Sequence, residues 1–229
     1  ASYLIENGIN ILVEKPLTDH FLDSEKLVDK VRKHGVIMAA GHIERHNPII
    51  SYVIKNLDRG IWGDIISFSS RRVSPYPVRI TDVGVIFDLF IHDIDILNYL
   101  SKASPTTVFS SGISRISDSL EDNIFTLLEF ENGISAFCEN SWLSPIKSRT
   151  LSILTSTHYL NIDYAEQSLE IFSDDKNNVV KDNYHSPYEE PLLIELTDFL
   201  QSVQTKRAPL VTVEEASEVV KLAQKALES

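Results

Sequence analysis

Short apolar runs alternate with a helical spacing along the first 40 residues. Residues 9–13 and 36–40 are apolar runs of the length expected for buried strands. Between them, residues 19–34 carry apolar side chains at helical spacing, and Gly35 stands where that helix would end. This alternation predicts two parallel strands joined by a right-handed helical crossover.

The pattern changes in the following segments. Asn47-Pro48 is typical of a helix N-terminus, and Gly60 ends the predicted helix. Extended runs then dominate. The clearest are residues 123–130 and 134–139, which alternate apolar and polar positions around Asn132-Gly133, a strong hairpin signal. Further strands are predicted at residues 64–73, 149–155, 159–163 and 168–173.

Two predicted helices close the chain. The first begins at Pro191, and its spacing predicts an inward face made of Leu192, Leu196, Phe199, Leu200 and Val203. In the second, Thr212 and Glu215 have the spacing of a capping box. A parallel strand pair followed by many further strands and flanking helices predicts the α/β (α+β) fold class.

Residues 81–100 form a strongly apolar stretch that nevertheless carries ionisable side chains. If a helix begins near Asp88, then Asp88, His92 and Asp95 recur at i, i+4 and i+7 and share one stripe. Such a stripe must be paired, solvated in a cleft or used in chemistry, because an unpaired buried charge is costly. A structural explanation, with Asp88 as a helix cap and His92 as a hydrogen-bonding residue, fits the pattern equally well.

Composition narrows the classes of function. The chain has 229 residues, of which 43% are hydrophobic and 24% charged, as in ordinary globular proteins. Lys and Arg number 21 against 33 Asp and Glu, and the net charge of −12 argues against nucleic acid as a partner. The single Cys138 excludes an internal disulfide. No apolar run approaches the ~18 residues of a membrane span, so we expect no membrane partner and a cytoplasmic location.

Several cations are candidates for ligand binding. Lys15 lies in Glu14-Lys15-Pro16, directly after a buried strand, where open α/β sheets bind their ligands. Arg72 and Arg79, with Arg45 upstream, could form a fork-shaped site for phosphate or carboxylate groups. The alternatives are a surface lysine at a strand end, and arginines that pair with the acidic surplus of the chain.

Four motifs occur in an order that resembles one enzyme family. They are Glu14-Lys15-Pro16 after a strand, the segment from Gly41-His42 to Asn47-Pro48, the pattern Asp88-x-x-x-His92-Asp93-x-Asp95, and the closing run 191–229. Together they resemble the glucose–fructose oxidoreductase / inositol dehydrogenase (Gfo/Idh/MocA) family. Residues 41–48 and 79–88 look most like its UDP-N-acetylglucosamine 3-dehydrogenase branch.

The resemblance implies an NAD(P)-dependent dehydrogenase with a Rossmann domain and an α/β domain that contains a large, mostly antiparallel sheet. Residues 1–45 would be the C-terminal part of the dinucleotide-binding domain. Residues 46–208 would form a substrate and oligomerisation domain, and residues 209–229 a C-terminal helix that packs back on the Rossmann part. Partners would be a sugar or nucleotide-sugar substrate and further copies of the chain, as a dimer or tetramer through the sheet.

The resemblance also implies roles for single residues. The catalytic residues, expected at the reacting hydroxyl, are Lys15, Asp88 and His92. The residues expected to bind NAD or NADP are Glu14, Lys15, Pro16 and Arg45. The residues expected to bind the substrate are Arg72, Arg79 and Asp88. No metal ligand is implied. The expected reaction is oxidation of a secondary hydroxyl of a sugar or nucleotide sugar, with C3 of UDP-N-acetylglucosamine as a candidate.

The family's glycine-rich fingerprint is missing, because no G-x-G-x-x-G occurs in the chain. We therefore expect an upstream segment to be absent, and dinucleotide binding by this chain alone to be weak. Two alternatives stay open. One is a metal-dependent hydrolase or isomerase that uses Asp88, His92 and Asp95. The other is an inactive truncated paralogue that acts as an oligomerising domain.

Overall fold

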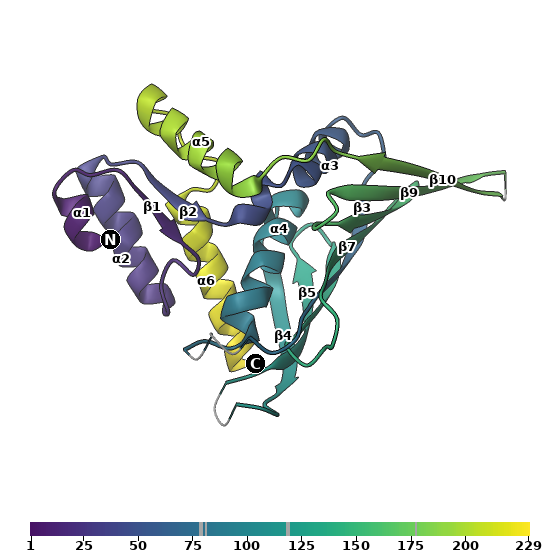
Figure 1. Cartoon of the computed structure of the whole chain (residues 1–229), viewed down its shortest axis with the longest axis horizontal. Coiled ribbons are helices and arrows are strands. Elements are labelled where there is room, and N and C mark those ends of the chain that lie inside the picture. Colours follow the sequence, from purple (N-terminus) through teal and green to yellow (C-terminus); the bar gives the residue numbers. More distant parts are fainter. Residues whose placement is uncertain (78–79, 81, 118–119, 177) are drawn as a thin grey trace.

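The computed structural model describes residues 1–77, 80, 82–117, 120–176 and 178–229. A small α/β part at the N-terminus lies beside a large twisted sheet, and the yellow C-terminal helix runs between the two (Figure 1). Among the described residues, no helix is both long enough and apolar enough to cross a bilayer.

The N-terminal part contains α1 (Ser2–Glu6), β1 (Ile11–Glu14), α2 (Phe21–His34) and β2 (Met38–Gly41). Strands β1 and β2 pair in parallel, as predicted, and their last register pair is Glu14 with Gly41. Gly35 ends α2 in the left-handed conformation with φ of 64°, which glycine adopts without a Cβ clash.

The large sheet has eight strands in the order β10-β9-β8-β7-β3-β6-β5-β4. The bounds are β3 Ile65–Val73, β4 Pro105–Ile113, β5 Asn123–Phe130, β6 Ser135–Ser141, β7 Ser148–Thr155, β8 His158–Asp163, β9 Ser168–Asp175 and β10 Asn178–His185. The β3–β6 pair is parallel and the other pairs among these strands are antiparallel. The predicted hairpin is present at β5–β6, with Gly133 at φ of 83°. This is the predicted mixed fold with a large, mostly antiparallel sheet.

Helices cover one face of this sheet. They are α3 (Pro48–Asp58), α4 (Ile91–Ser101) and α6 (Val213–Glu228), preceded by the short helical turns η1 (Ile43–His46) and η2 (Ile86–Phe90). Asn47 caps α3 by accepting a hydrogen bond from the Ile49 N–H, and the predicted capping box of α6 is present. Helix α6 contacts α2, α4 and β4, so it joins the N-terminal part to the sheet.

The opposite face of the sheet is apolar and exposed. Its side chains include Phe109, Phe125, Leu127, Phe137, Leu154 and Tyr159. Leu127 pairs with Phe109 on one side and with Phe137 on the other, so these side chains form a continuous row across three strands. Isolated exposed apolar residues need no explanation, but a continuous patch of this kind is typical of an interface.

Helix α5 (Pro191–Thr205) corrects one expectation. Leu192, Leu196 and Leu200 were predicted to face inward, but they are exposed. The side chains buried on this helix are Glu195 and Ser202. The 3.6-residue spacing identifies an apolar face of a helix, whereas the rest of the fold decides which face is covered. Figure 1 shows α5 projecting away from the body of the molecule.

Candidate active site

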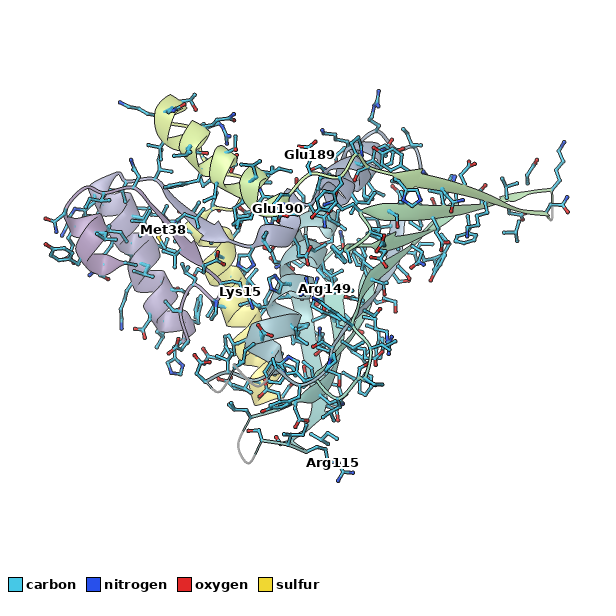
Figure 2. All side chains as sticks on the ribbon, in the orientation of Figure 1. Lys15, Met38, Arg115, Arg149, Glu189 and Glu190 are labelled. Atoms are coloured by element: carbon cyan, nitrogen blue, oxygen red, sulfur yellow. The ribbon has the colours of Figure 1, made fainter. Side chains whose placement is uncertain are left out.

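A pocket of about 490 Å³ lies where the two parts of the molecule meet. The end of β1 contributes Lys15, the turn η2 contributes Asp88, α4 contributes His92, and β3 and β7 contribute Arg72 and Arg149. In Figure 2, Lys15 and Arg149 both lie in the centre of the molecule, between the N-terminal helices and the sheet. Residues from four separate segments, one of them the continuous stretch of η2 and α4, thus face one cavity.

Lys15 and Asp88 form an ion pair in the pocket. The Lys15 ammonium donates to the Asp88 carboxylate at 2.8 Å and to the Asp88 backbone carbonyl, also at 2.8 Å. Both side chains are largely buried, with 17% and 20% of their surface exposed. Two acceptors on one residue therefore fix the position of the ammonium, which keeps a further proton for a ligand.

The predicted stripe of Asp88, His92 and Asp95 is divided in the structure. Asp88 lies in the π-helical turn η2, and the α-helix proper begins only at Ile91. Asp88 and His92 line the pocket, whereas the carboxylate of Asp95 binds Arg45 outside it. His92 and Asp95 lie three residues apart in the regular helix α4, and the buried cation Arg45 pairs with Asp95 on the side away from the pocket.

His92 is half-buried in the pocket wall. Burial lowers the pKa of His92 well below its usual value, and the nearby charges of Arg72 and Lys15 lower it further. The imidazole is therefore neutral at pH 7 and able to accept a proton. Its Nδ1 has no hydrogen-bond partner within the described part of the chain.

Arg72 is almost fully buried beneath the pocket. It donates from Nε to Asp93 at 3.0 Å and from Nη1 to Glu44 at 2.8 Å. Its guanidinium also lies over the ring of Tyr164, with 5.2 Å between them. The two carboxylates hold the pKa of Arg72 above its ordinary value despite burial. Much of its charge is thus already matched within the protein.

Arg45 lies outside this pocket, between two carboxylates. It binds Asp95 at 2.8 Å and Glu215 at 2.7 Å, and only 2% of its side chain is exposed. It does not line the pocket that contains Lys15. Arg45 therefore links η1 to α4 and α6, and its contact with the cofactor stays a prediction.

The remaining expected contacts lie at the β1 end of the pocket. Glu14 is exposed and lines the pocket. A Cβ at Gly41 would lie 2.9 Å from the Glu14 carboxylate, so this close approach requires glycine. The bond between Lys15 and Pro16 is cis, and Pro16 does not itself line the pocket. Arg79 lies outside the described residues.

Sequence reasoning missed several residues of the pocket. Arg149, Lys147, Trp142 and Glu44 all line it. Glu44 stands inside the motif of residues 41–48 and Arg149 begins a predicted strand, but nothing in the spacing marks their convergence. Within the described residues, no group of three His, Cys, Asp or Glu side chains is arranged to hold a metal ion.

Comparison with known proteins gives relatives that include nucleotide-sugar and inositol dehydrogenases and a 2,7-anhydro-N-acetylneuraminate hydratase. UDP-N-acetylglucosamine 3-dehydrogenase from Acidithiobacillus ferrooxidans is 26% identical over 213 residues, which cover 90% of this chain and 66% of that protein. The scyllo-inositol 2-dehydrogenase (NAD(+)) from Bacillus subtilis is 28% identical over 220 residues, which cover 90% of this chain and 64% of that protein. The chain thus spans about two thirds of the length of these relatives.

Solved structures show the same fold. A structure of the A. ferrooxidans UDP-N-acetylglucosamine 3-dehydrogenase superposes with a TM-score of 0.89 at 24% identity, covering 98% of this chain and 71% of that chain. A levoglucosan dehydrogenase in complex with NADH and L-sorbose gives a TM-score of 0.91 at 18% identity, covering 100% of this chain and 73% of that chain.

A model of a protein family completes the comparison. It describes the GFO/IDH/MocA C-terminal domain and matches residues 51–169, more than half of the 229 residues. The chain therefore belongs to the GFO/IDH/MocA family.

Proposed function

We propose that this chain carries the substrate and proton-transfer site of an NAD(P)-dependent oxidoreductase. The substrate would be a sugar or nucleotide sugar that is oxidised at a secondary hydroxyl, and the hydroxyl at C3 of UDP-N-acetylglucosamine is the first candidate. The observation that supports this proposal most strongly is the convergence of Lys15, Asp88 and His92, from two segments far apart in the sequence, on one pocket. Relatives named as sugar, inositol and nucleotide-sugar dehydrogenases support the same reaction class.

The three side chains would divide the proton chemistry of an alcohol oxidation. His92, neutral at pH 7 because of its lowered pKa, would accept the hydroxyl proton. Lys15 would donate a hydrogen bond to the same oxygen as negative charge develops on it. Asp88 holds the Lys15 ammonium in place. A bound nicotinamide dinucleotide would supply the acceptor for the hydride that leaves the carbon.

The residues of this chain fit one end of such a cofactor. Glu14 and Lys15 stand at the carboxyl end of β1, beside Gly41 at the end of β2, where open α/β sheets bind ligands. The sequence contains no glycine-rich cradle for the pyrophosphate. We therefore assign Glu14, Lys15 and Pro16 to the nicotinamide end, and Arg45 only to the support of that end.

The exposed apolar row on the sheet supports a homo-oligomer as part of the proposal. A second copy that covers Phe125, Leu127 and Phe137 would remove this patch from water. Leu127→Glu should shift a dimer or tetramer toward monomer in sedimentation experiments, and an unchanged mass would contradict this interface. The cytoplasmic location predicted from the sequence belongs to the same proposal.

The test is made on the full-length gene product with His92→Gln. This variant retains a polar side chain of similar size but cannot accept a proton near neutral pH. Oxidation of a panel of sugars and nucleotide sugars is followed through nicotinamide absorbance with NAD⁺ and NADP⁺. We expect turnover to fall by roughly 10²–10⁴-fold.

The matched control is His34→Gln, because His34 is exposed at the end of α2. It should retain wild-type turnover, and both variants should melt close to the wild-type temperature. Near-normal turnover in His92→Gln would remove His92 as the base. A wild-type protein that oxidises no member of the panel would favour the inactive paralogue.

A further inference from the structure

Two arginines stand directly opposite each other beside the pocket. Arg72 of β3 and Arg149 of β7 are register partners in an antiparallel pair, and both line the cavity. Like charges directly opposite on neighbouring strands are destabilising. Because this pairing works against folding stability, it indicates that the charges serve the cavity.

The carboxylates nearby match only part of this positive charge. Arg72 binds Asp93 and Glu44. The carboxylate nearest to Arg149 is the same Glu44, at 3.8 Å, and the oxygen involved already accepts a hydrogen bond from Arg72. Lys147 also lines the cavity, and its ammonium has no ion pair or hydrogen bond among the described residues.

We call Arg72, Lys147 and Arg149 the cationic wall. The carboxylates of Glu44 and Asp93 form ion pairs with this wall, so three cations share two anions. This local excess of positive charge occurs in a chain whose net charge is −12.

Two further observations indicate that the cationic wall lacks a partner. Arg72 is 2% exposed, yet its Nη2 has no hydrogen-bond partner in the part of the chain that the structure describes. Burial lowers the pKa of Arg149, and the charge of Arg72 lowers it further. Arg72 and Arg45, by contrast, have raised pKa values because carboxylates surround them. An oxyanion at the wall would compensate the charge of Arg149, whose side chain is 41% exposed.

We propose that the cationic wall is an anion subsite that holds phosphate or carboxylate oxygens of the sugar substrate. This inference rests on the proposed function and narrows its substrate class from sugars in general to sugars that carry an anionic group. Arg149 and Lys147 select for that anionic group. The Arg149 guanidinium can donate two parallel hydrogen bonds to it, and the Lys147 ammonium can place a positive charge beside it. Arg72 forms the floor of the subsite.

Binding is measured by calorimetry on the full-length gene product, without the dinucleotide. The probes are UDP-N-acetylglucosamine, N-acetylglucosamine 1-phosphate, glucuronate and neutral N-acetylglucosamine. The phosphate and carboxylate probes distinguish the two sources of an oxyanion. We expect at least one anionic probe to bind tenfold or more tightly than the neutral sugar, and its affinity to weaken with added salt.

The test variants are Arg149→Gln and Lys147→Gln. Each should weaken binding of the preferred anionic probe by about 10- to 100-fold, which corresponds to loss of one charged hydrogen bond, and leave the neutral sugar unaffected. The control is Arg115→Gln, which removes the same charge from an exposed arginine far from the cavity (Figure 2). Lys147 is exposed, so its replacement leaves the folded core intact even if Arg149→Gln is destabilised.

Equal affinity for the neutral and anionic probes, or equal effects of Arg115→Gln and both test variants, would overturn the subsite. The proposed function is judged separately by turnover. Oxidation of neutral sugars with the same efficiency as anionic ones would leave the function standing and remove the subsite. Anion binding that depends on Arg149, without oxidation of any probe, would leave the subsite standing and remove the function.

Discussion

The floor of the pocket at Arg72 and its outer wall at Arg149 and Lys147 carry the same charge in different surroundings. At the floor, Asp93 and Glu44 bind the buried guanidinium, and Asn140 donates to Asp93 at 2.6 Å. At the outer wall, the side chain of Arg149 is 41% exposed, and its nearest carboxylate is shared with Arg72.

This difference in exposure and pairing distinguishes cations that stabilise the fold from cations that we propose to bind a ligand. A buried cation must be matched within the protein, because leaving its charge uncompensated costs several kcal/mol. A cation at the rim can remain partly solvated until a ligand arrives. The same reasoning places Arg45 among the structural charges, since Asp95 and Glu215 match it. The predictions below test this division.

Removal of Asp93 should have the largest effect on stability. Asp93→Ala leaves Arg72 buried with one carboxylate in place of two, and we expect the free energy of unfolding to fall by about 3–5 kcal/mol. The control is Glu139→Ala, which breaks the half-exposed pair with Arg71, the neighbour of Arg72 on β3. That variant should lose at most about 1 kcal/mol. Urea unfolding measures both, and equal small losses would contradict the structural role of the floor.

Replacement of Lys15 should affect turnover more than stability. Lys15→Met keeps the apolar stem but removes the donor that would face the reacting oxygen, so kcat/KM should fall by about 10²–10³-fold. Lys30→Met on α2 is the matched control, because Lys30 only forms an exposed pair with Glu6. Steady-state kinetics on the full-length gene product decides the matter. Similar rates for the two variants would place Lys15 with the structural charges.

Glu195 offers a third case, a buried acid without a matching cation. Both of its carboxylate oxygens lack hydrogen bonds among the described residues, and Nε2 of His46 lies 3.9 Å from its Oε1. Burial raises the pKa of Glu195 to about 7, and Glu14 and Asp198 contribute. The folded carboxyl thus keeps its proton at pH values where the unfolded chain has released it. Stability should therefore fall as the pH rises from about 4.5 to 7.

The variant Glu195→Gln tests this case. It removes the titration, so at pH 8 it should be more stable than the wild type by about 1–3 kcal/mol, with no difference near pH 4.5. The control is Glu189→Gln, an exposed position just before the same helix (Figure 2). Unfolding curves from pH 4.5 to 8 provide the measurement. A constant difference across this range would mean that Glu195 does not titrate with folding.

Short sequence signals predicted where many of the helices and strands begin and end. Gly35, Asn47, the hairpin at Asn132-Gly133 and the capping box of Thr212 each end or begin an element through contacts within a few residues, so the sequence alone predicts them. The inward face of α5 could not be predicted in this way. Its leucines satisfy a helical period, but the cover of a helix depends on distant segments.

The site shows the same division between local and distant information. The motifs around Lys15, Asp88 and His92 led to the pocket, because chemistry-bearing residues stand out in apolar segments. The pairing of Arg72 with Arg149 depends on the register of β3 with β7, which are far apart in the chain. The resemblance implied a cofactor contact for Arg45, whereas its ion pairs with the buried Asp95 and the partly exposed Glu215 depend on the fold.

In the proposed enzyme, His92 acts on the reacting hydroxyl while Arg149 holds the substrate's anion. The most direct test is the split between kcat and KM for His92→Gln and Arg149→Gln, measured side by side on the full-length gene product with its best anionic sugar. We predict that His92→Gln lowers kcat by roughly 10²–10⁴-fold with little change in KM, whereas Arg149→Gln raises KM by about 10- to 100-fold with little change in kcat. If both variants changed the same parameter by the same factor, the division between a reacting group and a binding group would be contradicted.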